Sequence, residues 1–299
     1  METHGRAEGE PRVIKVLLYH RIIDDASSSR AHWSCIPIEQ FRRQVELLDR
    51  WGFTAITLQD YQLFQRGELD LPAKPVILTF DDGYLDTYRY AFPILRQFGM
   101  RAVVFVLGDR RIKTNYWDKN RGIPEAPLME DAQILEMYQE GFEIGAHSMS
   151  HIDLTRLPED KVWEEISRSR ILLEILLNGS VQSFSYPYGT VNAITKRMVQ
   201  HAGYTAACGV ATGPAAFGRD SLEIRRLTIT SSIGVTGFAL RLLTPYQYYA
   251  WFKWAAKKLL SPVARDERDL NRLLAEKKRR HRHRRSSTIE LTKEKAYEE

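Results

Sequence analysis

Hydrophobic and polar positions follow two alternating patterns along most of the chain: short continuous apolar runs, and segments in which apolar residues recur at helical spacing. Short apolar runs, such as those at 13–18 and 75–80, are typical of strands buried in a parallel sheet. Between such runs, apolar residues recur at helical spacing, as Phe41, Val45 and Leu48 do. Strands that alternate with helices in this way favour a mainly parallel α/β fold over a sandwich.

The number of candidate strands indicates the architecture. About eight strands suit a closed or nearly closed (β/α) barrel, although a doubly wound open sheet has the same local pattern. The alternation stops after residue 231, which predicts a barrel over 13–231, a helical extension over 232–262 and a charged, disordered tail over 263–299. The candidate strands lie at 13–18, 53–58, 75–80, 102–107, 142–146, 181–186, 204–210 and 223–229.

Two adjacent carboxylates follow the strand at 75–80. Asp81, Asp82 and Gly83 stand where the apolar run ends. Two acids at the tip of a buried strand lose solvation free energy unless a metal ion or a catalytic task compensates. Such a pair is also a common helix cap or turn, so this motif alone is weak.

Two imidazoles follow the later candidate strand at 142–146. His147 and His151 are four positions apart, so one turn of helix or a tight loop brings them onto one side. Two histidines and one carboxylate form a ligand set that leaves a divalent metal ion an open position for water. A lone His-x-x-x-His is more often a chance spacing. Because both motifs end predicted parallel strands, where α/β folds gather their chemistry, we interpret them together as one metal site.

Composition and charge say little about the substrate. The chain has 299 residues, is 43% hydrophobic and carries a formal net charge of +5. The segment 277–285 holds seven Lys and Arg residues, so the rest of the chain has a net charge of −2 and the basicity belongs to the tail. Cys35 and Cys208 form no Cys-x-x-Cys pattern, which argues against a disulfide framework and a thiolate metal site.

The cellular location is predicted from these features. Residues 1–12 are polar and resemble no export signal, and no apolar run reaches the ~18 residues of a membrane span. With only two distant cysteines, the sequence fits a reducing compartment. We expect a cytoplasmic protein, or one held peripherally at the inner membrane face.

Three motifs in this order resemble those of the polysaccharide deacetylases (NodB homology, carbohydrate esterase family 4). The resemblance covers about residues 13–229. It implies a distorted (β/α) barrel and metal-dependent hydrolysis of an N-acetyl group on a sugar, usually N-acetylglucosamine in a polymer. The motifs are Thr79-Phe80-Asp81-Asp82-Gly83, His147-Ser148-Met149-Ser150-His151 and Phe184-Ser185-Tyr186-Pro187-Tyr188-Gly189.

The resemblance assigns a role to each motif residue. It implies that Asp81 is the general base and that Asp82, His147 and His151 hold the metal ion. The ion is zinc in most such enzymes, with cobalt, manganese or nickel as alternatives. A cation of this kind polarises a carbonyl and activates water, and a neighbouring carboxylate takes the proton of that water. The backbone N–H of Tyr188 would help to hold the oxyanion.

The sequence departs from the family pattern in two places. Ser185 stands where an arginine commonly orients the base, and no Leu-x-x-His strand with a general acid follows Gly189. The first strand ends in Leu17-Leu18-Tyr19-His20, which has that pattern and is similar to the circularly permuted poly-N-acetylglucosamine deacetylases. We therefore predict His20 as the general acid; the alternative is a hydrogen-bonded histidine without catalytic duty.

Aromatic residues give two further hypotheses. Trp33, Tyr116 and Trp117 are candidates for a sugar platform, although loop aromatics that merely cover a barrel are as common. Tyr248 and Trp251 belong to an aromatic helix that predicts contact with an anionic membrane, aided by the basic run; packing against the barrel or a partner is an equal alternative. Nucleic acid is not predicted as a partner, because no binding motif accompanies the basic run.

The leading hypothesis is a metal-dependent carbohydrate N-deacetylase. Its substrate would be an N-acetylated sugar or glycan precursor in the synthesis of cell-surface polysaccharide. One alternative is a hydrolase of another non-peptide C–N bond, such as that of a cyclic amide, on the same fold. The other is a glycan-binding scaffold without catalysis.

Overall fold

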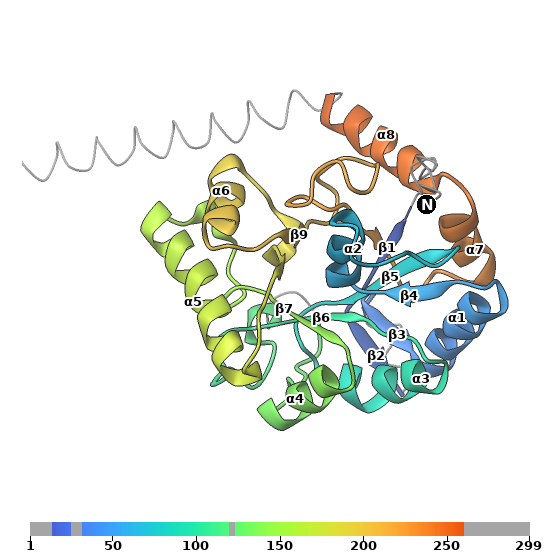
Figure 1. Ribbon diagram of the computed structural model, residues 1–299, viewed down its shortest axis with the longest axis horizontal. Helices are drawn as coiled ribbons and strands as arrows, with labels where there is room; N and C mark the ends of the chain where they lie inside the picture. Colours follow the sequence, from blue (N-terminus) through green and yellow to red (C-terminus); the bar gives the residue numbers. More distant parts are fainter. Residues whose placement is uncertain (1–13, 25–31, 120–122, 260–299) are drawn as a thin grey trace, which may run out of the picture. The chain divides into compact units, whose positions relative to one another are not determined.

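The computed structural model describes residues 14–24, 32–119 and 123–259, and one curved parallel sheet lies at its centre (Figure 1). The sheet has eight strands in the order β10-β1-β5-β6-β7-β8-β9, with β4 paired to β5. All of its strand pairs are parallel, as the alternation of strands and helices predicts. The strands are Lys15–Tyr19 (β1), Thr54–Ile56 (β4), Pro75–Phe80 (β5), Val103–Val106 (β6), Glu143–Ala146 (β7), Ser183–Ser185 (β8), Ala206–Cys208 (β9) and Leu227–Thr228 (β10).

Strand β5 is the centre of this sheet. Its six residues are all buried, and β1 pairs with it from Val76 to Phe80. On the opposite edge, β4 pairs with the first half of β5, while β6 pairs with Thr79 and Phe80. A strand covered on both edges and both faces must be apolar throughout, which explains its continuous hydrophobic run.

The two ends of the sheet are linked by the segment that leads into β10. A parallel bridge joins Cys208, the last residue of β9, to Ile224. Two residues later in the same segment comes Arg226, directly before β10, and β10 pairs with β1. The last strand therefore lies beside the first, and the predicted distorted (β/α) barrel is confirmed.

Helices surround the sheet in the first compact unit (Figure 1). Amphipathic spacing places Phe41, Val45 and Leu48 of the first helix in the core. Capping boxes fix the starts of α2 and α6. The helices of this unit are Ile38–Arg50 (α1), Leu58–Gln65 (α2), Phe92–Gln97 (α3), Asp131–Gln139 (α4), Glu159–Leu177 (α5), Ala193–His201 (α6) and Val235–Leu243 (α7). Tyr246–Leu259 (α8) begins in this unit and continues into the second one.

The chain divides into two compact units, residues 1–248 and 249–299. Helix α7 belongs to the first unit, because it packs Phe238 and Leu242 into the main core. The predicted boundary after residue 231 stays a prediction. The predicted tail at 263–299 lies outside the described residues. No helix in the described part of the chain has the length and apolarity needed to cross a membrane.

Strand register brings the carboxyl ends of the strands to one rim. Tyr19 is paired with Phe80, and Ala146 is paired with Phe184. The residues that follow these strands therefore meet at the same edge of the sheet, where parallel α/β folds place their functional groups.

Candidate active site

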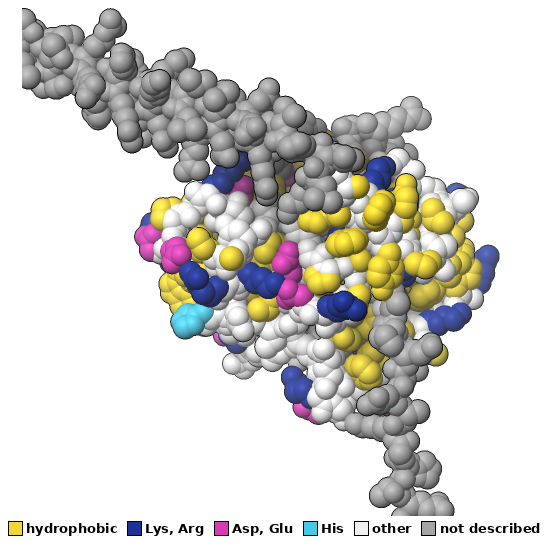
Figure 2. Space-filling model, turned by 90° about the horizontal axis from the view of Figure 1, so that it is seen from above, with side chains coloured by type: hydrophobic (Ala, Val, Ile, Leu, Met, Phe, Trp, Pro, Cys, Tyr) yellow, Lys and Arg dark blue, Asp and Glu magenta, His cyan; other side chains and the backbone are white. Residues whose placement is uncertain are grey.

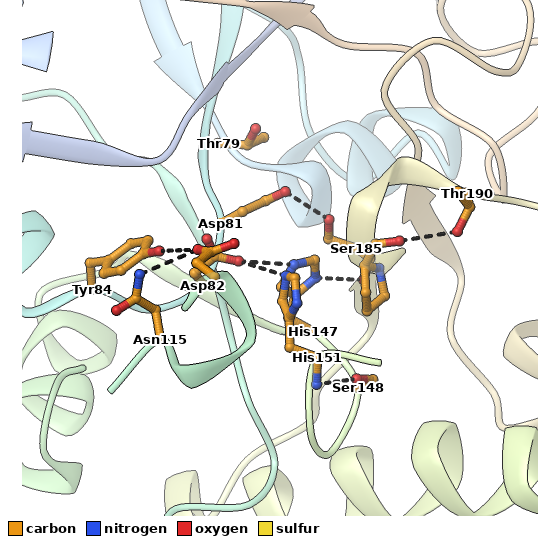
Figure 3. A network of polar contacts seen from close by, with 12 residues as sticks. Thr79, Asp81, Asp82, Tyr84, Asn115, His147, Ser148, His151, Ser185 and Thr190 are labelled. Atoms are coloured by element: carbon orange, nitrogen blue, oxygen red, sulfur yellow. Dashed lines mark hydrogen bonds and ion pairs between the residues drawn. The ribbon is translucent and has the colours of Figure 1, made fainter. Parts of the chain in front are cut away.

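A tight turn after β5 presents the two carboxylates. Asp82 has a φ of 73° and Gly83 a φ of 72°, so the chain turns sharply through the left-handed region. A Cβ on Gly83 would lie 3.0 Å from the side chain of Val106, so this glycine also allows a close approach to β6. The turn directs Asp81 and Asp82 toward different partners, as Figure 3 shows.

Asp82, His147 and His151 converge at the rim. Asp82 Oδ1 lies 3.2 Å from His147 Nε2 and 3.1 Å from His151 Nε2, and all three side chains are buried. The loop after β7 makes this possible, because His151 has a φ of 57° and donates its backbone N–H to Ser148 Oγ at 3.0 Å. The two imidazoles predicted to lie on one side thus do so (Figure 3).

The chemistry of this triad fits a divalent metal ion. Apart from the two imidazole nitrogens, the buried Asp82 Oδ1 has no hydrogen-bond partner among the described residues. His147 Nδ1–H donates to the backbone oxygen of Ser185 at 2.7 Å, which leaves Nε2 as the ligating atom. Ligands of a tetrahedral zinc site at ~2.0–2.1 Å from the ion stand about 3.3 Å apart, close to the two separations observed.

Arg226 binds Asp81, the carboxylate that is not part of the Asp82, His147 and His151 triad. Its Nη1 and Nη2 lie 2.7 Å from Asp81 Oδ1 and Oδ2, which is the bidentate geometry of a strong charge-assisted pair. Its Nε donates to the backbone oxygen of Gly209 at 2.9 Å, and its Nη2 donates to Ser185 Oγ at 3.0 Å. The Arg226 side chain is completely buried. The carboxylate of Asp81 is therefore fixed in orientation.

The electrostatics of the site keep Asp81 ionised. Burial by itself would raise the pKa of this carboxyl, but the charge of Arg226 and the nearby His147 outweigh it, so its pKa lies below the usual value. The Ser185 hydroxyl also donates to Asp81 Oδ2 at 3.1 Å. Asp81 is thus a carboxylate at neutral pH, as a general base must be.

Arg226 was not predicted from the sequence. Ser185 stands where an arginine was expected, and the guanidinium of Arg226 reaches the carboxylate of Asp81 from the segment before β10. A signal was present, because a charged residue inside the predicted strand 223–229 needs a buried partner. The identity of that partner was not visible in the sequence.

His20 lies in the same pocket as the two carboxylates. It follows β1 directly, and the pocket that it lines has a volume of about 330 Å³. Its Nδ1 is buried without a hydrogen-bond partner among the described residues, and its ring meets Trp33 edge to face at 5.6 Å. The pocket is lined by Leu18, His20, His32, Trp33, Ser34, Asp81, Asp82, Tyr84, Trp117, Asp118, Ile123, His147, His151, Tyr188, Gly189, Val210 and Thr228.

The aromatic candidates occupy different places. The Trp117 ring stacks on His151, with centroids 4.3 Å apart and planes inclined by 16°, and Trp33 is 48% exposed at the pocket. Tyr116 is exposed and donates its hydroxyl to the backbone of Ser150, and it does not line the pocket. Trp117 therefore supports a candidate metal ligand, while its role toward a sugar stays a prediction.

Tyr188 stands at a strained turn beside the triad. Its φ is 59°, and its ring lies edge to face with His151 at 4.7 Å. The next residue is Gly189, where a Cβ would approach Val210 to 2.4 Å. This turn brings the backbone of Tyr188 to the pocket, which is compatible with the predicted oxyanion contact of its N–H.

A third pocket carboxylate was not predicted. Asp118 is buried, and its Oδ2 accepts hydrogen bonds from Tyr84 Oη and Asn115 Nδ2, both at 3.3 Å. It stands in the loop after β6, where the sequence shows only a Tyr-Trp-Asp run without a motif. Both of these hydrogen-bond partners are neutral, whereas Asp81 is bound by the charged Arg226.

Comparisons with known proteins agree with this geometry. The model of the family described as Polysaccharide deacetylase matches residues 68–207. YxkH of Bacillus subtilis (strain 168), whose name refers to the polysaccharide deacetylases, is 28% identical over 230 residues, covering 77% of this chain and 75% of that protein. The poly-beta-1,6-N-acetyl-D-glucosamine N-deacetylase of Escherichia coli (strain K12) is 25% identical over 258 residues, covering 76% of this chain.

The match spans only 38% of the length of that Escherichia coli protein. Among solved structures, the Streptococcus pyogenes deacetylase PplD in complex with acetate aligns with a TM-score of 0.66 and 24% identity. The alignment covers 78% of this chain and 99% of that chain, so the two share a fold.

Proposed function

Because this chain belongs to the polysaccharide deacetylase family, whose enzymes are carbohydrate deacetylases, we propose that it is a metal-dependent hydrolase of N-acetyl groups on a glycan or glycan precursor. One observation carries the proposal. A buried Asp-His-His group and a separately held carboxylate, Asp81, line one pocket together with His20. Such a set can bind a metal ion, accept a proton and donate a proton within one site.

Each residue has a chemical task in this proposal. Asp82, His147 and His151 would hold the ion, which supplies polarisation of the acetamide carbonyl and activation of water. Asp81 takes a proton from the attacking water as the new C–O bond forms. His20 gives a proton to the sugar nitrogen as the C–N bond breaks, so that acetate and an amine leave.

The main test is acetate release by the purified protein. We expect activity on N-acetylglucosamine oligomers, β-1,6-linked ones included, and no activity on cyclic amides that lack a sugar. Hydrolysis of the cyclic amides alone would contradict the proposal and support another C–N hydrolase. Binding of oligomers without acetate release, by a protein that carries its metal ion, would support a scaffold instead.

Removal of a metal ligand is expected to abolish both metal binding and activity. In His151→Ala, two ligand atoms remain, so the stoichiometric ion is lost along with its contribution to stability. The measurement is metal content by elemental analysis, together with the zinc dependence of the melting temperature. His201→Ala is the matched control, because that histidine is exposed on α6 beside Trp163. Equal metal content in both variants would exclude the triad as the site.

Loss of the general acid is expected to depend on the leaving group. In His20→Ala, kcat for N-acetyl hydrolysis should fall by about 10²–10⁴-fold, because the amine must leave without a proton. An activated aryl acetate, whose leaving group needs no proton, should lose far less. Metal content should be unchanged. An equal loss on both substrates would show that His20 has a structural duty instead.

The location of the reaction is also part of the proposal. We propose that the protein acts in the cytoplasm or at the inner membrane face, on a precursor of surface polysaccharide. Cys35 and Cys208 support this, because both are free thiols buried in the described structure. Fractionation of cells followed by detection of the full chain would test it; recovery from outside the cytoplasmic membrane would contradict it.

A further inference from the structure

The last described helix exposes an aromatic face. Tyr248, Trp251 and Phe252 of α8 are 44%, 40% and 68% exposed, and helical spacing places them on one side. Figure 2 shows hydrophobic side chains gathered in one area of the face that it presents, with single Lys and Arg side chains between them. Several exposed aromatic rings on one side of a helix are typical of an interaction surface.

Positive charge accompanies this aromatic face. Lys253 follows Phe252 directly and is exposed, and helical spacing turns it away from Tyr248 and Trp251 toward the opposite side of the helix. In the sequence, Lys257 and Lys258 come one turn later, and the run 277–285 adds seven further Lys and Arg residues. No acidic residue occurs within α8. The helix therefore combines large aromatic rings with positively charged side chains and has no negatively charged ones.

We propose that α8 docks this face on an anionic lipid surface, a property that goes beyond the deacetylase activity. Rings of Trp and Tyr have an apolar body and a polar edge, which suits the boundary between headgroups and acyl chains. Neighbouring lysines can lay their alkyl stems along the same boundary and keep their charge at the headgroups. The basic run adds attraction to anionic lipid. The helix lies on the surface and does not cross it.

Charge also argues against two alternative partners for this face, a second copy of the chain and the chain's own segment 263–299. A second copy of the chain would bring another set of lysines and another basic run against the first, and like charges repel. The chain's own segment 263–299 is rich in charged residues and poor in apolar ones, so it has little surface with which to cover aromatic rings. An anionic lipid surface complements both the rings and the cations.

The test is sedimentation of the full chain with lipid vesicles. We expect binding to phosphatidylcholine vesicles that contain phosphatidylglycerol, weaker binding to phosphatidylcholine alone, and further weakening as salt is raised. The double variant Trp251→Ser with Phe252→Ser should bind at least about tenfold more weakly, because its apolar anchor is lost. The melting temperature and the far-UV circular dichroism spectrum should be unchanged, which shows that the variant is folded.

The matched control is Ile175→Ser on α5, an apolar side chain that is 71% exposed elsewhere on the chain. It should bind vesicles as the unmodified chain does. The proposal is overturned if no vesicle binds the full chain, or if the α8 variant binds as well as the control. It is likewise overturned if the only effect of the α8 variant is a change from dimer to monomer in analytical ultracentrifugation. None of these outcomes depends on whether the enzyme is active.

Discussion

The Asp81→Asn variant is expected to lose about 10²–10⁴-fold in kcat/KM for acetate release, the usual contribution of a positioned base. Asn cannot take a proton from water, yet its amide oxygen can still accept one hydrogen bond from Arg226. The metal ligands are untouched by this change. The rate should therefore fall while zinc content stays stoichiometric, as steady-state kinetics and elemental analysis on the same preparation would show.

A control separates loss of the base from loss of the fold. In Asp81→Asn the buried charge of Arg226 loses its counter-ion, so the melting temperature should fall, and the kinetics must be measured below the cooperative transition of the variant. Activity close to that of the unmodified chain would remove Asp81 from the mechanism. Loss of zinc together with activity would mean that Asp81 belongs to the metal site.

Replacing Arg226 by Met should destabilise the protein by about 3–5 kcal/mol, because it leaves the charge of Asp81 buried without a partner. The measurement is the free energy of unfolding from denaturant titration. The double variant Arg226→Met with Asp81→Asn should recover much of the loss, since both charges are then gone. Equal losses in the single and double variants would show that Arg226 acts by packing alone.

The substitution Arg226→Met should also reverse the pH dependence of stability that arises from the carboxyl of Asp81. With Arg226 present, the pKa of Asp81 is below its unfolded value, so its contribution is present above pH ~4 and is lost on acidification. Without Arg226, burial raises the pKa of Asp81, so the variant should become more stable as pH falls toward ~4. The acid limb of kcat/KM should move to higher pH for the same reason.

Local patterns predicted the parts of the site that lie within one loop. The apolar run of β5 followed by Asp81 and Asp82, and the spacing of His147 and His151, are short-range features that periodicity and ligand chemistry can identify. The parallel sheet then places these loops at one rim. His20 was predicted from the Leu-x-x-His pattern of the first strand and its family resemblance, and in the structure that strand pairs with β5.

Long-range pairing was the part that the sequence left open. Arg226 and Asp81 are 145 residues apart, and nothing in the local pattern says which buried carboxylate a given arginine meets. The small sheet of Arg21–Ile23 (β2) and Cys35–Pro37 (β3) was not predicted, because three-residue strands are too short to show a period. Likewise, the sequence indicated Trp117 as a candidate for sugar binding, but it did not indicate that the Trp117 ring stacks on the ring of His151.

The position of Arg226 near the end of the barrel has a consequence for biosynthesis. A ribosome completes β1 and β5 long before it reaches β10, so the growing polypeptide holds the carboxylate of Asp81 without its neutralising guanidinium. The barrel core of the nascent chain cannot enclose that charge at low cost until the last strand emerges. The site around Asp81 can therefore become complete only after the segment before β10 has been synthesised.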